Sequence, residues 1–198
     1  NIQNVSALIT HQVLTPSITL PSSAAWKENY IKPNGFNIGF AVGSGKAQKF
    51  KRWDFNNFVD LAKRLQADNI NCLLIIGPDE VDLHQKAQVE NIQIVEESLL
   101  QTALVISKLN MLVGNDNGMM HIGYATNITT LTIFGMTDER IIGGYNDRNH
   151  VFSLPMECRP CFRSEVGKIK CDNTVCLSNI DVDSVYKKIK KLCIDKKL

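Results

Sequence analysis

The chain has 198 residues, of which 44% are hydrophobic and 21% are charged, and its formal net charge is +2. These values are typical of a globular protein with a buried core, and so small a charge gives no indication of a nucleic-acid partner. No run approaches the roughly 18 consecutive apolar residues of a membrane span, and the first residues lack the pattern of a signal peptide. We therefore expect a cytoplasmic protein.

Residues 1–35 differ from the rest of the sequence. They contain three prolines and a pair of serines and show no sustained periodicity, apart from one short helix expected over residues 24–30. Together with the initial Asn1, this pattern predicts a linker, or the end of a missing N-terminal domain. Residues 36–198 then form the main domain.

Short apolar runs alternate with helical patterns from residue 36 onward. The runs have the character of buried parallel strands, and they cover residues 36–42, 72–76, 92–95, 111–113 and 130–134. Helices are expected after the capping residue Asp54, over 99–108 behind Ser98, after Gly118, and from about Asp181. This alternation predicts an α/β fold with a doubly wound, Rossmann-like parallel sheet. Such sheets bind ligands at the C-terminal ends of their strands.

The loop after the first predicted strand has the residue types of a phosphate site. It runs through Gly43-Ser44-Gly45-Lys46 to Lys51-Arg52-Trp53, directly before the helix capped by Asp54. Backbone amides, a hydroxyl and ammonium groups suit an anionic group there. It is not a P-loop, because Phe40 replaces the first glycine and Ala47 the magnesium-binding hydroxyl residue, and Gln48 breaks the dinucleotide fingerprint. A solvent-exposed basic loop without a ligand is the alternative.

A second candidate follows the fourth predicted strand, in Asn115-Asp116-Asn117-Gly118-Met119-Met120-His121. Asp116 lies at the strand's C-terminal end, and Gly118 lets a ligand approach the first turn of the next helix. An Asx-turn with a helix cap and a core histidine at position 121 is the alternative. A third loop, Phe134-Gly135-Met136-Thr137-Asp138 followed by residues 140–145, could close over a small ligand.

Four motifs in this order resemble the C-terminal domain of the ADP-heptose:lipopolysaccharide heptosyltransferases, glycosyltransferase family nine. They are Lys51-Arg52-Trp53, Gly77-Pro78-Asp79-Glu80, Asn115 to His121, and Phe134 to Asp138. The resemblance implies one half of a two-domain GT-B glycosyltransferase, whose missing N-terminal domain supplies the acceptor site and the general base. This half would bind ADP-heptose or a similar nucleotide sugar, and the acceptor would be the lipopolysaccharide core.

The resemblance also implies roles for individual residues. Ser44 and Gly45 would contact the diphosphate, and Lys51 would stabilise the departing diphosphate as the catalytic residue. Glu80 would accept hydrogen bonds from the ribose, and the backbone around Glu97 would meet the adenine. The sugar and phosphates would be met by the remaining four residues, Asp116, Asn117, Gly118 and His121. No cofactor is required for this chemistry. A nucleotide-binding regulatory or scaffold module that retains the pocket without transfer is the alternative.

Two further features concern metal and membrane. The six cysteines are too few for a disulfide scaffold. Four of them have a spacing that could hold zinc, namely Cys158, Cys161, Cys171 and Cys176. Free thiols packed in a C-terminal loop are the alternative. Lysines gather near the C-terminus, which indicates the solvated face of a helix or, alternatively, a peripheral contact with the inner face of the inner membrane.

Overall fold

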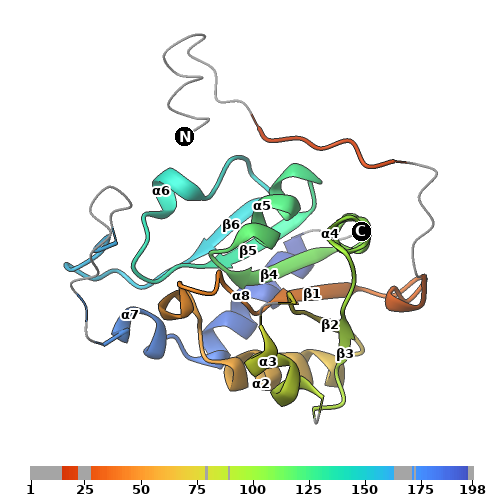
Figure 1. The fold of residues 1–198 in the computed structure, drawn as a ribbon, viewed down its shortest axis with the longest axis horizontal. Coiled ribbons are helices and arrows are strands. Elements are labelled where there is room, and N and C mark those ends of the chain that lie inside the picture. Colours follow the sequence, from red (N-terminus) through yellow and green to blue (C-terminus); the bar gives the residue numbers. More distant parts are fainter. Residues whose placement is uncertain are drawn as a thin grey trace.

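A computed structural model describes residues 15–21, 28–78, 80–88, 90–162, 171 and 173–195. Its centre is a single six-stranded parallel sheet in the order β3-β2-β1-β4-β5-β6, with helices on both faces (Figure 1). The order runs outward in one direction from β1 to β3 and in the other from β4 to β6. The predicted doubly wound, Rossmann-like sheet is therefore confirmed.

The strands are β1 Asn37–Ala41, β2 Asn71–Ile75, β3 Gln93–Val95, β4 Met111–Asn115, β5 Thr129–Ile133 and β6 Asn149–Phe152. The α-helices are α2 Phe55–Ala67, α3 Val81–Ala87, α4 Leu99–Ser107, α5 Gly118–Ala125, α6 Glu139–Ile142, α7 Val175–Ser178 and α8 Val182–Asp195. Two 3₁₀ turns, η1 Glu28–Tyr30 and η2 Lys49–Lys51, complete the elements of the described residues. In that part of the chain, no helix has the length and apolar character that a membrane span needs.

Alternate residues of the central strands supply the two cores, one on each face of the sheet. Ile38 and Phe40 of β1 pack with α2 and α8 on one face, where Phe58 of α2 and Ile189 of α8 are fully buried. Ala41 of β1 packs on the opposite face, under α4 and α5. Both faces are covered, so all five residues of β1 are buried.

The predicted helix caps are present. Asp54 accepts a hydrogen bond from the Asn56 amide at 2.8 Å, and Ser98 accepts one from the Gln101 amide at 3.4 Å. Each satisfies an amide that has no partner within its own helix, and so fixes where the helix begins. Because α2 and α4 begin at fixed points, the loops that precede them are held at the C-terminal edge of the sheet.

The main domain begins earlier than residue 36. Tyr30 is buried in the core beneath α4 and α5, and its carbonyl accepts a hydrogen bond from the Asn71 side chain at 3.0 Å. The expectation that residues 1–35 are all linker is thus wrong for residues 28–35, because a buried aromatic ring ties them to the sheet. Only the end of the expected helix over 24–30 lies among the described residues, where it is the 3₁₀ turn η1.

Candidate functional site

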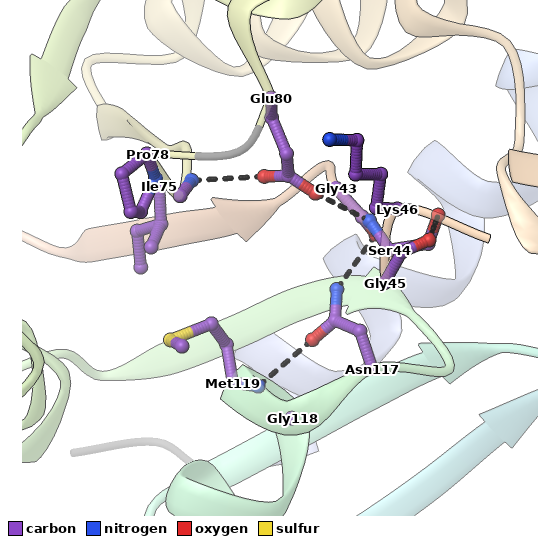
Figure 2. Close-up of a pocket in the computed structure, with 11 residues that line it drawn as sticks. Gly43, Ser44, Gly45, Lys46, Ile75, Pro78, Glu80, Asn117, Gly118 and Met119 are labelled. Atoms are coloured by element: carbon purple, nitrogen blue, oxygen red, sulfur yellow. Dashed lines mark hydrogen bonds between the residues drawn. The ribbon is translucent and has the colours of Figure 1, made fainter. Parts of the chain in front are cut away.

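A hollow of about 190 Å³ opens at the C-terminal ends of β1, β2 and β4 (Figure 2). It lies where the strand order reverses, the usual ligand position in a doubly wound sheet. The lining comes from three loops and consists of Gly43, Ser44, Gly45, Lys46, Ile75, Gly77, Pro78, Glu80, Asn117, Gly118 and Met119.

The floor of this pocket is the loop between β1 and α2. Ser44 is buried, whereas Gly45 and Lys46 are exposed at the rim. A turn closed by the Gln48 amide on the Gly45 carbonyl, at 2.7 Å, leads the chain into η2. The loop therefore offers a buried hydroxyl and an exposed ammonium to the same cavity.

Glu80 stands over this loop with its carboxylate buried in the pocket wall (Figure 2). One carboxylate oxygen accepts from the Ser44 amide at 2.5 Å and the other from the Gly77 amide at 2.8 Å. A Cβ atom on Gly43 would lie only 1.6 Å from Glu80 Oε1. Glycine is therefore required at position 43, because only a backbone without a side chain leaves room for the carboxylate.

Arg52 contacts Glu80 and Ser44 but does not itself line the pocket. Its Nε donates to Ser44 Oγ at 3.0 Å, and its Nη1 donates to Asp82 Oδ2 at 3.0 Å. Its Nη2 lies 3.5 Å from Glu80 Oε1. The guanidinium thus links the β1–α2 loop to the start of α3. No role specific to Arg52 could be predicted from the sequence, because a basic residue within a basic motif carries no separate signal.

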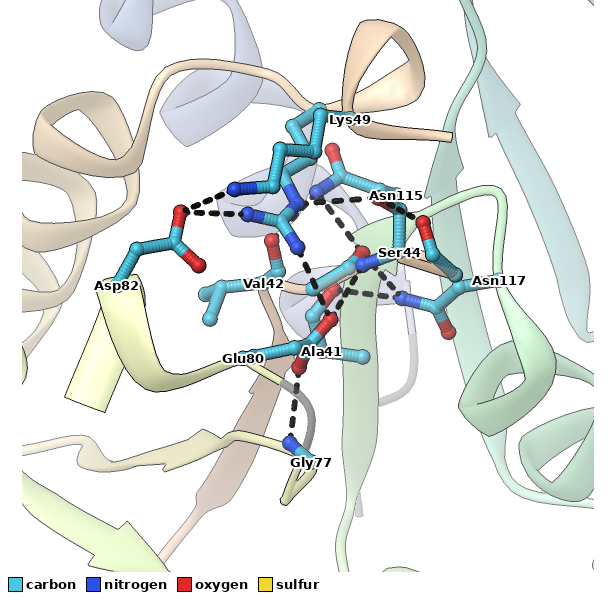
Figure 3. A network of polar contacts seen from close by, with 12 residues as sticks. Ala41, Val42, Ser44, Lys49, Gly77, Glu80, Asp82, Asn115 and Asn117 are labelled. Atoms are coloured by element: carbon cyan, nitrogen blue, oxygen red, sulfur yellow. Dashed lines mark hydrogen bonds and ion pairs between the residues drawn. The ribbon is translucent and has the colours of Figure 1, made fainter. Parts of the chain in front are cut away.

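Two asparagines join β1 to β4 (Figure 3). Asn115, fully buried, donates to the Val42 carbonyl at 2.7 Å and accepts from the Trp53 amide at 2.8 Å. Asn117 donates to the carbonyls of Ala41 and Gly43, and its oxygen caps the amides of the two residues after Gly118. The side chain of Asn117 is thus occupied in holding the pocket together, and the groups expected to meet the phosphate or sugar here are backbone amides. Its neighbour Gly118 has no atom within 4 Å of its Cβ position, which leaves its backbone open to a ligand.

Lys51 and Asp116 form a buried ion pair beside the pocket. Lys51 Nζ lies 2.8 Å from Asp116 Oδ2, and each side chain is at least nine-tenths buried. The ring of Phe162 lies 5.5 Å from the ammonium. Neither residue lines the hollow itself. The positive charge of Lys51, which is expected to meet a diphosphate, is therefore neutralised by the carboxylate of Asp116, which is expected to meet a sugar.

Three rings surround this ion pair. His121 contacts Tyr124 at 5.4 Å between ring centroids, and Tyr124 contacts Tyr145 at 5.3 Å. Partial burial lowers the pKa of His121, and the charge of Lys51 lowers it further while Asp116 opposes the shift. His121 nevertheless has an exposed surface, so it is not a core histidine. Burial and the nearby Asp116 raise the pKa of the half-buried Tyr145 phenol, which stays protonated and can donate a hydrogen bond.

The match that decides the family covers residues 16–170, where the chain fits the model of glycosyltransferase family 9 (heptosyltransferase). The chain belongs to this family. Lipooligosaccharide heptosyltransferase 2 of Campylobacter jejuni subsp. jejuni serotype O:6 (strain 81116 / NCTC 11828) is 26% identical over 176 residues, which are 83% of this chain and 52% of the relative. The chain thus spans about half the length of this curated relative.

Solved heptosyltransferases share the fold. E. coli ADP-heptose lps heptosyltransferase II superposes with a TM-score of 0.68 at 18% identity, over 90% of this chain and 57% of its own. E. coli heptosyltransferase WaaC with ADP gives 0.62 at 22% identity, over 87% and 46%. This family 9 chain therefore has the fold of one half of a GT-B glycosyltransferase, as its sequence predicts.

The other expected site residues lie apart from the pocket lining. Glu97, after β3, accepts a hydrogen bond from the Tyr30 hydroxyl at 2.9 Å, which ties the expected adenine-binding backbone to η1. In the third candidate loop, Asp138 caps α6 and forms an ion pair with Arg140 at 2.8 Å. Its carboxylate therefore has a structural partner.

The four cysteines of the expected zinc site form no disulfide within the described residues, with Cys158 exposed, Cys161 and Cys171 partly exposed and Cys176 buried. Burial is the main cause of the raised pKa values of Cys161 and Cys176, and neighbouring cysteines raise both further. Among the described residues, no three His, Cys, Asp or Glu side chains are grouped as metal ligands. Residues 163–170, between the second and third cysteine, lie outside that part of the chain. The zinc site stays a prediction.

Proposed function

We propose that this chain is the donor-binding half of a heptosyltransferase and holds ADP-heptose or a similar nucleotide sugar. The observation that carries the proposal is the pocket at the strand-order reversal, where Ser44, the uncovered backbone of Gly118 and the fixed carboxylate of Glu80 line one cavity. Two relatives support the choice of ligand. One is by name an ADP-heptose heptosyltransferase and the other was solved with ADP.

In this proposal, Ser44, Gly45 and the backbone of Gly118 meet the diphosphate. The ribose hydroxyls donate to Glu80, whose two oxygens each accept only one backbone amide and so retain acceptor capacity toward the cavity. The backbone near Glu97 meets the adenine. Asp116 and the neutral ring of His121 face the sugar.

Transfer would leave negative charge on the departing diphosphate. Lys51 is a buried cation beside the pocket, and it would stabilise that charge by leaving Asp116, whose carboxylate then accepts from the sugar hydroxyls. We propose no catalytic cofactor, because an ammonium and helix amides supply the positive charge that a metal would otherwise provide. The general base would come from an N-terminal acceptor-binding domain, and the acceptor would be the lipopolysaccharide core.

We propose that the enzyme works at the cytoplasmic face of the inner membrane. Lysines on α8 could contact anionic lipids, although two are already paired, Lys187 with Asp183 and Lys190 with Asp68. Vesicles containing phosphatidylglycerol should then bind the chain weakly and lose it at high salt. A nucleotide-binding regulatory module without transfer remains the second candidate, and it predicts ADP binding with no turnover by the protein joined to its acceptor-binding domain.

Calorimetry with ADP tests the binding. Lys51→Ala should weaken ADP binding by about 10- to 100-fold, the value of one charge-assisted contact. Lys49→Ala is the matched control, since Lys49 is exposed and contacts only Asp82 at 3.4 Å among the described residues. We expect it to change affinity less than threefold. If no binding is detected at about millimolar ADP, the binding free energy is less favourable than roughly −4 kcal/mol, and the proposal is refuted.

A further inference from the structure

We infer that Arg52 is a positioning residue that fixes Glu80 and Ser44 for recognition of the ribose and the diphosphate. This inference rests on the proposed function, since it concerns how the same pocket selects its nucleotide. Arg52 does not line the pocket, so its effect on a ligand would pass through the two residues that it holds.

The contacts of Arg52 link two parts of the chain that are distant in sequence, the β1–α2 loop and the residues between β2 and α3. The guanidinium is nine-tenths buried, and it reaches Ser44 Oγ, Asp82 and Glu80 at 3.0, 3.0 and 3.5 Å. Its planar fork directs each nitrogen to a different partner, a geometry that a lysine ammonium cannot reproduce. Arg52 thus fixes the β1–α2 loop and the residues after β2 relative to each other.

The carboxylate of Glu80 is held on the sides that face the protein. The amides of Ser44 and Gly77 bind its two oxygens, the backbone of Gly43 leaves no room behind it, and Arg52 lies beside Oε1. Glu80 also lines the cavity. A carboxylate fixed in this way is an acceptor already oriented for a diol, and binding then costs little conformational entropy.

One donor of Arg52 is incompletely satisfied. Its Nη2 is buried and has no hydrogen-bond partner among the described residues, with Glu80 Oε1 just too far at 3.5 Å. Buried guanidinium nitrogens in a purely structural role are normally hydrogen-bonded. A movement of Glu80 by about half an ångström would make this a charge-assisted hydrogen bond. Contacts between Glu80 and a ribose would therefore be coupled to Arg52.

A coupling of Arg52 to ribose recognition would have a consequence that a purely structural role of Arg52 would not have. If Arg52 served only stability or general charge, its loss would weaken every nucleotide to the same degree. If it positions Glu80, its loss would weaken ADP more than 2′,3′-dideoxy-ADP, which lacks the hydroxyls that Glu80 would accept. The ratio of the two affinities is the informative quantity.

The experiment measures binding of ADP and 2′,3′-dideoxy-ADP by calorimetry to the chain and four variants. We expect the unchanged chain to prefer ADP by about tenfold or more. Arg52→Met should weaken ADP binding by about tenfold and reduce the preference to below about threefold, as Glu80→Gln should. Adding Arg52→Met to Glu80→Gln should change the preference no further. Lys49→Met removes a charge from the same loop and from the same partner Asp82, but it should keep the preference.

A preference that survives in Arg52→Met, with ADP and the dideoxy compound weakened equally, would overturn the inference. If thermal melting shows that Arg52→Met does not fold, Arg52→Lys carries the test by the same ratio, because it keeps the charge and loses the fork. An unchanged chain that binds no ADP would refute the proposed function and this inference with it. If the unchanged chain and the Arg52→Met variant both prefer ADP over the dideoxy compound, the inference alone is refuted.

Discussion

Replacing Gly43 with alanine is the sharpest test of the pocket's internal structure. The new Cβ would lie 1.6 Å from Glu80 Oε1 and 1.9 Å from Oε2 and Cδ, so the carboxylate must leave. It would then lose the hydrogen bonds from the Ser44 and Gly77 amides. Each such bond to a charged group contributes roughly 1.5–3 kcal/mol, and water would replace part of the loss. We therefore expect Gly43→Ala to lower the free energy of unfolding by about 2–4 kcal/mol.

Gly45→Ala is the matched control for this substitution. It makes the same chemical change two residues further along the loop, where the nearest atom to the new Cβ is Gln48 Oε1 at 3.9 Å. Without a clash, alanine should be neutral or should stabilise by up to about 1 kcal/mol through the unfolded chain. Urea unfolding of both variants, monitored by the fluorescence of the buried Trp53, gives the two free energies. Gly43→Ala and Gly45→Ala of equal stability would refute the placement of Glu80.

Three further predictions concern the ion pair, the histidine and the cysteines. Lys51→Met alone should destabilise the chain by about 3–5 kcal/mol because it leaves the Asp116 carboxylate buried without its cation. In urea unfolding, the double variant Lys51→Met with Asp116→Leu should recover most of this loss. Equal losses in the single and double variants would contradict the ion pair. Because the folded-state pKa of His121 is lowered, its contribution to stability is complete above the unfolded-state pKa of about 6.5 and is lost as the pH falls through the folded-state pKa. The loss should be small for a ring with an exposed surface, and His121→Gln should remove it from the pH dependence of the melting temperature; an unchanged pH profile would count against the shift. A zinc site on Cys158, Cys161, Cys171 and Cys176 predicts about one metal per chain by elemental analysis and slow reaction of these thiols with Ellman's reagent. Metal-free protein in which the exposed Cys158 thiol reacts first would exclude the zinc site.

Elements with a strong hydrophobic pattern could be predicted from the sequence, and weakly patterned ones could not. The apolar run of β1 packs on a core and was expected within one residue of each bound, and α2 begins directly after its expected cap, Asp54. The edge strand β6 was not expected, because it reads Asn-His-Val-Phe and three of its four residues are only partly buried. The helix α3 has only seven residues, too few for a clear helical period.

The candidate site divides in a similar way. Glycines and charged residues after strands indicated the correct edge of the sheet, because that edge follows from the parallel topology alone. The pairing within the site could not be deduced, since Arg52 and Glu80, or Lys51 and Asp116, are far apart in the chain and meet only once the strand order is known. Nor could the sequence show that the Asn117 side chain forms hydrogen bonds with backbone groups, because an asparagine serves equally well as a helix cap or as a ligand contact.

The polar groups at this edge of the sheet are bound to one another. Lys51 is paired with Asp116, and Glu80 with two amides and Arg52. A nucleotide sugar would therefore exchange contacts at some positions and add them at others. Lys51 must give up a buried carboxylate to meet a phosphate, and that carboxylate needs a new donor, which the sugar hydroxyls would supply. ADP alone offers no such donor, so the exchange would be complete only with the sugar attached. On this argument a nucleotide sugar should bind more tightly than ADP, and the difference should disappear in Asp116→Asn, whose amide needs no cation.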